Sequence, residues 1–355
     1  MDLFFFHHDE YERLYNCSFK TYDEWLKYGV QNFFHGQLYL IIGTIYIVLY
    51  IPILIVMTRP KLMQNSCWKI MFFLGIVDIG STILNCIIPG YMGVRGVVGC
   101  NYIHFFYVNG CLAIAFWFCQ CCTCTVLAIN RCVDFWKPRW MAWLFEGKTT
   151  FLWIIGCLAY FWAGFFYCAP PIFSSQGMAY FFDPYFLIPM EDVPVERSGY
   201  MSRFHSLNNI AIVFILPVFY AFLVFSVWLK GRAATSASLS KMQKQLFIQS
   251  FWICFLNFVA ASVYVCMQFF PIPFFFITVG QMMWQGSNGG AVVIYLLMNN
   301  TIRSGVLEMI CGPFGKYHTN GRTSSVVSGT VKPSGQRTGS TQSRGVAPAS
   351  SGHLM

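Results

Sequence analysis

Long uninterrupted apolar stretches alternate with short polar segments along most of the chain. Seven of them reach about 20 residues, the length that an α-helix needs to cross the hydrocarbon core of a bilayer. They lie near residues 35–57, 68–91, 102–130, 149–169, 207–229, 246–270 and 274–298. Because these stretches lack the alternation of membrane β-strands, helices are the structure that satisfies their backbone in lipid. The pattern predicts an all-α membrane protein, a bundle of seven transmembrane helices.

The boundaries of these stretches divide the chain into four parts. Pro170 and Pro171 end the fourth stretch, because proline cannot continue a helix and disfavours helical backbone in the preceding residue. Only three residues, Pro271-Ile272-Pro273, separate the sixth stretch from the seventh. We expect an N-terminal segment (1–34), the bundle (35–300), a short amphipathic helix (301–311) and a tail (312–355).

Charge is sparse and unevenly divided between the two sides of the predicted bundle. Charged residues make up 10% of the chain, against about 25% in soluble domains. One side holds seventeen basic and three acidic residues, and the other holds six basic and ten acidic residues. Because Lys and Arg concentrate in cytoplasmic loops, the N-terminus is expected outside the cell and the C-terminus inside. The net charge of +9 therefore indicates membrane orientation and attraction to anionic lipid, not nucleic-acid binding.

The last part of the chain has a different composition. Residues 312–355 are rich in Gly, Ser, Thr, Pro and Arg and contain almost no large apolar side chain. Such a composition cannot form a packed core, so we expect a disordered tail. Its many hydroxyl groups fit a phosphorylated regulatory segment and equally fit a plain solvated terminus.

Two charged residues stand out within the apolar stretches. Asp78 is the only acidic residue inside a predicted helix core, where a carboxylate is costly and usually functional. It suits a conformational switch, a cation site or a proton relay, or else a structural hydrogen-bond hub with Ser81 or Asn85. Arg131 stands where the third helix is expected to reach the cytoplasm. It is either a latch beneath the bundle or a side chain that snorkels to the interface.

The cysteines and one sequon suggest covalent features rather than a metal site. Cys119, Cys121, Cys122 and Cys124 do not converge on one ion at helical spacing, so they are expected to pack in the core. Cys100, at the outer end of the third helix, is expected to form a disulfide with Cys17 or Cys168, and we favour Cys17. Asn16 begins an N-glycosylation sequon on the predicted outer side. Cys311 follows the last helix and is a candidate for lipidation.

Enzyme classes find little support in the sequence. An intramembrane aspartyl protease needs two acids, and only Asp78 lies in a predicted helix core. The seven histidines show no pair at i,i+4 spacing, which membrane metalloenzymes would need. The seventh stretch has no lysine for a retinal Schiff base. We therefore expect neither enzymatic activity nor a cofactor.

Several blocks of sequence resemble G-protein-coupled receptors, and more specifically the class T serpentine chemoreceptors of nematodes. The blocks are Ser66–Phe72 with Asp78, Leu127–Cys132, and Tyr295–Asn299 with Arg303. The resemblance covers roughly residues 35–310. The chain departs from the rhodopsin-like pattern in two motifs, because Asn130 replaces the acid before Arg131 and Ala291–Tyr295 keeps only the final tyrosine of the seventh-helix motif. The sixth stretch also lacks a core proline.

The resemblance implies a chemosensory receptor of the plasma membrane, and possible placement in sensory cilia. By position, Asp78 and Tyr295 would be switch residues. Coupling to a heterotrimeric G protein would involve Asn130, Arg131, Lys241 and Lys244. Arrestin and receptor kinases would act on the tail. A ligand would shift an equilibrium between two helix packings.

Polar and aromatic residues at the outer helix ends are candidates for a ligand pocket. They are His104, Tyr107, Asn208, Tyr264, Gln268, Gln281 and Trp284. With no intramembrane charge in the outer half, we expect a small neutral or weakly polar ligand. The alternatives are a ligand-gated channel or transporter, which would need polar rings or internal repeats, and a non-signalling scaffold or lipid-binding protein.

Overall fold

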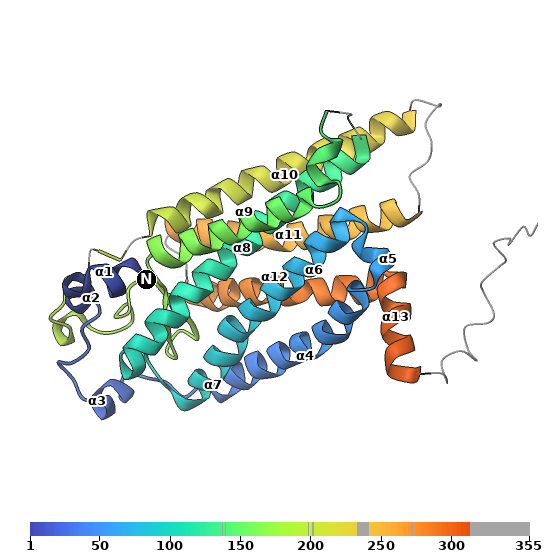
Figure 1. The fold of residues 1–355 in the computed structure, drawn as a ribbon. Coiled ribbons are helices and arrows are strands. Elements are labelled where there is room, and N and C mark those ends of the chain that lie inside the picture. The colour runs from blue at the N-terminus through green and yellow to red at the C-terminus, as the bar shows by residue number, and fades with distance from the viewer. Residues whose placement is uncertain are drawn as a thin grey trace, which may run out of the picture. The chain divides into compact units, whose positions relative to one another are not determined.

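Long helices form the body of the structure, a computed structural model, and lie side by side (Figure 1). The structure describes residues 1–136, 138, 140–197, 199–200, 202–232, 241–270 and 273–312. The long helices are α4 (Phe33–Met57), α6 (Ser66–Thr82), which the π-helical turn η1 (Ile83–Ile87) and α7 (Ile88–Arg95) continue, α8 (Ile103–Trp136), α9 (Thr149–Tyr167), α10 (Arg203–Arg232), α11 (Lys241–Phe269) and α12 (Phe275–Met298). Their order confirms the predicted helical bundle.

Six of these membrane spans are long and apolar enough to cross a bilayer by themselves. The seventh candidate is α12 joined to α13 (Asn300–Cys311), a pair bent by 89°. The share of each span that is buried inside the structure differs widely, from 72% for the span Gly99–Trp136 to 17% for Thr149–Tyr167. The helix α8 is therefore the most buried of these six spans, and α9 presents most of its surface to lipid.

Shorter elements gather at the two ends of the bundle. The short helices are α1 (Asp2–Phe6), α2 (His8–Leu14), α3 (Tyr22–Leu26), α5 (Pro60–Met63) and the 3₁₀ turns η2 (Gly99–Tyr102), η3 (Ala142–Phe145) and η4 (Met190–Asp192). Two strands, β1 (Ile172–Ser174) and β2 (Ala179–Phe181), form an antiparallel hairpin with Ile172 opposite Phe181. The apolar pattern predicted neither α1–α3 nor this hairpin, because each is too short to show a period of its own.

The third predicted stretch was drawn too short. The helix α8 does not end near residue 130 but continues to Trp136, so Arg131 lies within the helix and is 4% exposed. The side chain is therefore buried in the bundle, and the snorkelling alternative is wrong. The second stretch also runs further than expected, to Arg95, and contains the π turn.

The N-terminal segment and the loop between α9 and α10 pack together over one end of the bundle. We call residues 1–32 and the described part of 170–202 the cap, the end that it covers the cap end, and the opposite end the Arg131 end. The buried core of the cap is aromatic and includes Tyr11, Tyr15, Trp25, Tyr185 and Tyr200. Burial raises the pKa of Tyr15 well above its usual value. The phenol therefore stays neutral in the cap at physiological pH.

Covalent and polar contacts fix the cap to the helices. A disulfide joins Cys17 to Cys100, the pair favoured from the sequence, whereas the thiol of Cys168 lies 2.8 Å from Ser202 Oγ. Gly110 of α8 is needed where the loop crosses this helix, because a Cβ atom there would lie 2.2 Å from the Pro171 carbonyl oxygen. The cap and the helices therefore share one packed interface.

Candidate functional site

Asp78 lies at the centre of a buried polar cluster that four helices build. Tyr50 of α4 donates a hydrogen bond from Oη to Asp78 Oδ2 at 2.6 Å, and Gln120 of α8 donates from Nε2 to Oδ1 at 3.0 Å. Asp78 is 1% exposed on α6. Both donors are neutral, so the carboxyl group is held by hydrogen bonds alone, which a buried polar group requires.

The seventh helix completes this cluster through its backbone. Gln120 also donates to the Ser287 carbonyl oxygen at 3.1 Å, and Tyr50 Oη lies 3.0 Å from the Asn288 carbonyl oxygen. Tyr295 lies seven residues after Asn288 on the same helix. Its side chain is fully buried, and its hydroxyl has no hydrogen-bond partner among the described residues. An unpaired buried hydroxyl costs about 1–3 kcal/mol. A different packing of α12 that gave Tyr295 a partner would recover this free energy.

The π turn η1 exposes backbone carbonyls that an α-helix would keep to itself. Gln281 and Gln285 of α12 both donate to the Asn85 carbonyl oxygen, at 3.0 and 2.8 Å. Tyr180 of β2 donates to the Leu84 carbonyl oxygen at 2.5 Å. Such π turns occur frequently at functional sites. Here the turn connects the cap hairpin to α12.

A small cavity lies directly beneath the cap. Its walls come from α8, α10, α11, α12 and the cap, and the lining residues are Ile114, Trp117, Pro171, Tyr180, Phe182, His205, Tyr264 and Trp284. Its volume is about 30 Å³. Pockets for drug-sized ligands usually measure about 300–1,000 Å³, so a ligand of that size would need the aromatic wall to move.

Two polar atoms in the cavity wall are unpaired. His205 Nδ1 and Trp284 Nε1 are buried and have no hydrogen-bond partner among the described residues. The other His205 nitrogen, Nε2, lies 3.2 Å from Asn209 Nδ2. An indole N–H donates a hydrogen bond, and an imidazole nitrogen donates or accepts according to its tautomer. The wall therefore combines apolar aromatic surface with two positions for hydrogen bonds.

The cavity and the Asp78 cluster meet on α12. Trp284, whose ring lines the cavity, accepts hydrogen bonds at its carbonyl oxygen from Ser287 Oγ at 2.8 Å and from Asn288 Nδ2 at 2.9 Å. The carbonyl oxygens of Ser287 and Asn288 in turn contact Gln120 and Tyr50. A displacement of Trp284 would therefore move the next turn of α12, whose carbonyl oxygens contact Gln120 and Tyr50, the partners of Asp78.

At the Arg131 end, the arginine is held by its own helix. Arg131 Nη2 donates to Asn130 Oδ1 at 2.5 Å, and Nη1 lies 3.4 Å from Asp134 Oδ2, one turn further along α8. Asn130 also donates to Ser66 Oγ of α6 at 2.8 Å. Lys244 at the start of α11 is exposed. Asp134 thus supplies the acid that the residue before Arg131 lacks.

Comparisons with known proteins identify the family and support the fold. Residues 1–318 match the family model described as serpentine type 7TM GPCR chemoreceptor Srt. The chain belongs to the Srt family. It is similar to serpentine receptor class T-55 of Caenorhabditis elegans, with 26% identity over 302 residues that cover 83% of this chain and 80% of the relative. Its fold is similar to that of squid rhodopsin, with a TM-score of 0.56, 15% identity and coverage of 86% and 89% of the two chains.

The Srt structure brings together only part of the pocket expected from the sequence. Tyr264 and Trp284 line the cavity. Gln281 contacts the π turn instead, and Asn208 accepts a hydrogen bond from Tyr160 Oη at 3.0 Å outside the lining. The side chain of Gln268 lies outside the described residues, as does that of Lys241.

Two further residues of the expected pocket belong to the cap interface. His104 Nδ1 lies 2.7 Å from Tyr11 Oη, and Tyr107 packs edge-on against Tyr15 with ring centroids 4.8 Å apart. Tyr107 is therefore covered by the chain's own N-terminal segment, whereas His104 contacts this segment and stays exposed. Half of the lining that the sequence did not indicate comes from the cap loop (Pro171, Tyr180 and Phe182), and half comes from helices (Ile114, Trp117 and His205). Tyr180 and Phe182 carry no motif and lie in a segment read as a connection.

The two predicted modification sites occupy different ends of the Srt bundle. Asn16 is half-buried in the cap, and its Oδ1 accepts hydrogen bonds from the Ser18 backbone and hydroxyl, at 2.9 and 2.7 Å. Cys311 is exposed at the end of α13. Both modifications remain predictions.

Proposed function

We propose that this Srt protein is a chemosensory receptor that detects a small external molecule and activates a heterotrimeric G protein. The cap would face the outside of the cell and the Arg131 end the cytoplasm, as the charge distribution predicts. The plasma membrane, including that of sensory cilia, would be its location. The observation that carries the proposal is the hydrogen-bonded connection from the cavity wall at Trp284 to the partners of Asp78.

Ligand entry would widen the small cavity by moving its aromatic wall. A ligand shifts a conformational equilibrium only if it binds one state better than the other. His205 Nδ1 and Trp284 Nε1 offer unpaired hydrogen-bonding positions among aromatic rings. Both fit a small, neutral or weakly polar molecule with an acceptor group. A strongly cationic amine would find no acid in this cavity lining.

Asp78 and Tyr295 would then respond as switch residues. Movement of Trp284 would disturb the backbone of α12 next to Gln120 and Tyr50, the two groups that hold Asp78. Rearrangement of this cluster allows α12 to turn, and the unpaired hydroxyl of Tyr295 favours a packing that gives it a partner. The two packings of α12 thus differ in which buried polar groups are paired.

Arg131 would act as the latch at the cytoplasmic end. In the present packing its guanidinium is held against Asn130 and Asp134 on the same helix. Release of this arginine, together with Lys244 and the neighbouring basic residue Lys241, would offer donors to backbone carbonyls of a G protein. Buried arginines are frequent energetic centres of protein interfaces.

Arg131→Ala should abolish ligand-stimulated nucleotide exchange on the G protein and leave surface expression intact. Removal of such an arginine costs about 2 kcal/mol or more, which is about thirtyfold in affinity. Arg59→Ala is the matched control, because Arg59 lies at the same end but is exposed and paired with Glu308. Normal exchange by the Arg131 variant would remove this residue from the mechanism.

The proposed orientation has a separate test in the sugar acceptor of the cap. Asn16→Gln should abolish a mass shift that deglycosylation produces on the unmodified protein, because the cap would face the secretory lumen during synthesis. Thr301→Ala is the control, since it removes the sequon that begins at Asn299 on the opposite side. A mass shift that depends on Thr301 instead would reverse the orientation.

A further inference from the structure

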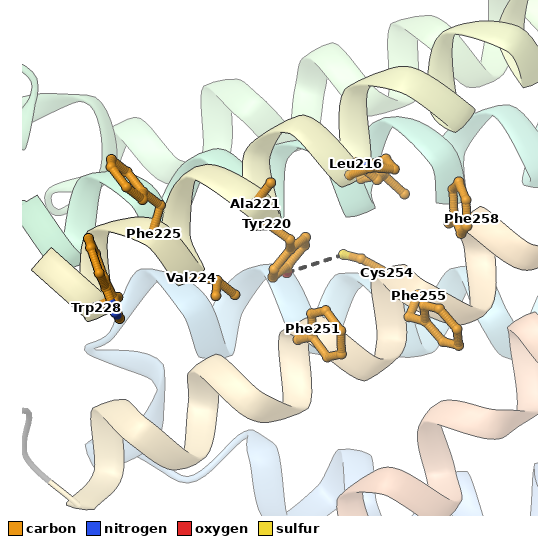
Figure 2. Close-up of a pocket in the computed structure, with 11 residues that line it drawn as sticks. Leu216, Tyr220, Ala221, Val224, Phe225, Trp228, Phe251, Cys254, Phe255 and Phe258 are labelled. Atoms are coloured by element: carbon orange, nitrogen blue, oxygen red, sulfur yellow. Dashed lines mark hydrogen bonds between the residues drawn. The ribbon is translucent and has the colours of Figure 1, made fainter.

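A second hollow runs along the flank of the bundle between α10 and α11, separate from the cavity under the cap. Its volume is about 630 Å³. Figure 2 shows the side chains of the two helices facing each other across it. The lining residues are Leu216, Pro217, Tyr220, Ala221, Val224, Phe225, Trp228, Phe251, Cys254, Phe255 and Phe258. We call this hollow the α10–α11 groove.

The chemistry of the groove suits hydrocarbon. Its floor is deeply buried, with Leu216, Tyr220 and Cys254 at most 5% exposed. The hydroxyl of Tyr220 donates to Cys254 Sγ at 3.4 Å, so it is already paired (Figure 2). The rims are formed by half-exposed apolar side chains such as Val224 and Phe255. A polar ligand would lose its hydration here without gaining compensating hydrogen bonds.

The length of the groove matches one leaflet of a bilayer. From Leu216 to Trp228 the helix α10 advances twelve residues, which is about 18 Å at the usual rise. Half of the hydrocarbon core is about 15 Å thick. Trp228 occupies the end of the groove that points toward the Arg131 end, and tryptophan is enriched at the membrane–water interface. The groove thus extends from that interface toward the bilayer centre.

The sequence is basic near the end of the groove that lies toward the Arg131 end. The helix α10 ends at Arg232 and α11 begins at Lys241. Between residues 227 and 250 the sequence contains Lys230, Arg232, Lys241 and Lys244 and no acidic residue. Each basic residue near a membrane surface contributes roughly 1 kcal/mol of attraction to anionic lipid, which corresponds to about fivefold in binding. The apolar groove matches the acyl chain of a lipid, and the basic residues near its end match a negatively charged headgroup.

We propose that the α10–α11 groove binds one acyl chain of an anionic phospholipid from the leaflet at the Arg131 end. The headgroup would lie near the last residues of α10 and the first residues of α11, where the sequence is basic. The occupant stays in the membrane and is distinct from the external ligand. The site does not depend on the proposed receptor mechanism, since its evidence is the lining and the charge at its mouth.

Photo-crosslinking tests the site on the full chain in lipid nanodiscs. The probe is phosphatidylserine with a diazirine on one acyl chain, and labelled peptides are mapped by mass spectrometry. Adducts should concentrate on residues 216–228 and 251–258. Ala221→Trp should reduce labelling of these peptides about tenfold, the change expected when roughly two methylene groups lose their burial. Val218→Trp is the matched control, because Val218 is 65% exposed on α10 and does not line the groove.

The headgroup is tested with phosphatidylcholine that carries the same photoactive chain. Phosphatidylserine should label the groove more strongly, and Lys230→Gln with Arg232→Gln should remove that advantage by about fivefold per charge. On the unmodified chain, unlabelled phosphatidylserine should compete better than phosphatidylcholine. Equal labelling by the two lipids would overturn the proposal. Labelling that is unchanged by Ala221→Trp would also overturn it, and so would protection of the groove by a second copy of the chain.

Discussion

The two ends of the bundle are held together in different ways. At the cap end, contacts join residues far apart in sequence, including a disulfide over 83 positions and hydrogen bonds from Tyr185 Oη to the carbonyl oxygens of Leu14 and Asn16. At the Arg131 end, the buried arginine is paired with Asp134 of its own helix, and Arg59 pairs with Glu308 on the exposed surface. The cap end therefore resists separation of its parts.

The difference indicates which end of the molecule moves. Local opening is cheapest where few buried contacts cross between elements. An ion pair within one helix does not tie that helix to its neighbours, whereas the disulfide ties the N-terminal segment to α8. We infer that the cap stays attached to α8 when the aromatic wall of the cavity moves, and that the helix ends near Arg131 rearrange. Substitutions that remove contacts at each end test this inference.

Cys17→Ser should have the largest effect on stability. Loss of a native disulfide typically costs about 2–4 kcal/mol, and the loop closed here is long. Thermal unfolding in detergent should show a lower midpoint, and limited proteolysis should cut the N-terminal segment faster. Cys266→Ser is the control, because Cys266 is an exposed free cysteine. An unchanged midpoint for Cys17→Ser would mean that aromatic packing alone holds the cap.

The Asp78 cluster, between the two ends, should show a smaller but specific effect. A double-mutant cycle of Tyr50→Phe and Asp78→Asn should give a coupling free energy of about 1–2 kcal/mol, because the two side chains share a buried hydrogen bond. Tyr39→Phe is the control on the same helix, since its hydroxyl donates to the Met178 carbonyl oxygen in the cap. Additive effects of Tyr50 and Asp78 would contradict a shared switch.

The bundle was predictable from the sequence because a membrane span needs a long apolar stretch, and that signal does not depend on tertiary contacts. The cap was not, since its aromatic residues pack only against distant partners, as Tyr15 does against Tyr200. Only two of the eight residues that line the cavity were predicted. Tyr264 and Trp284 lie on predicted helices, whereas Tyr180 reaches the cavity through a short hairpin.

The acid that pairs with Arg131 was missed for a different reason. Asp134 is three residues beyond Arg131, the spacing at which helical side chains meet. It was assigned to a loop because the apolar stretch fades near residue 130, yet the helix continues to Trp136. The end of an apolar pattern marks where the lipid-facing surface changes, not where the backbone hydrogen bonds stop. Charged residues just past such an end are therefore candidates for helical pairs.

Asp134→Asn should have the smallest effect on stability and a measurable effect on signalling. The ion pair joins a buried arginine to a carboxylate that is 29% exposed, so its loss should cost at most about 1 kcal/mol. If the pair restrains Arg131, ligand-independent nucleotide exchange should rise, by up to about fivefold for that free energy. Glu308→Gln, which breaks the exposed pair with Arg59, should leave basal exchange unchanged. Equal basal exchange in both variants, with coupling still lost in Arg131→Ala, would show that Asp134 positions the arginine without restraining it. The Arg131 end would then rearrange without release of a latch.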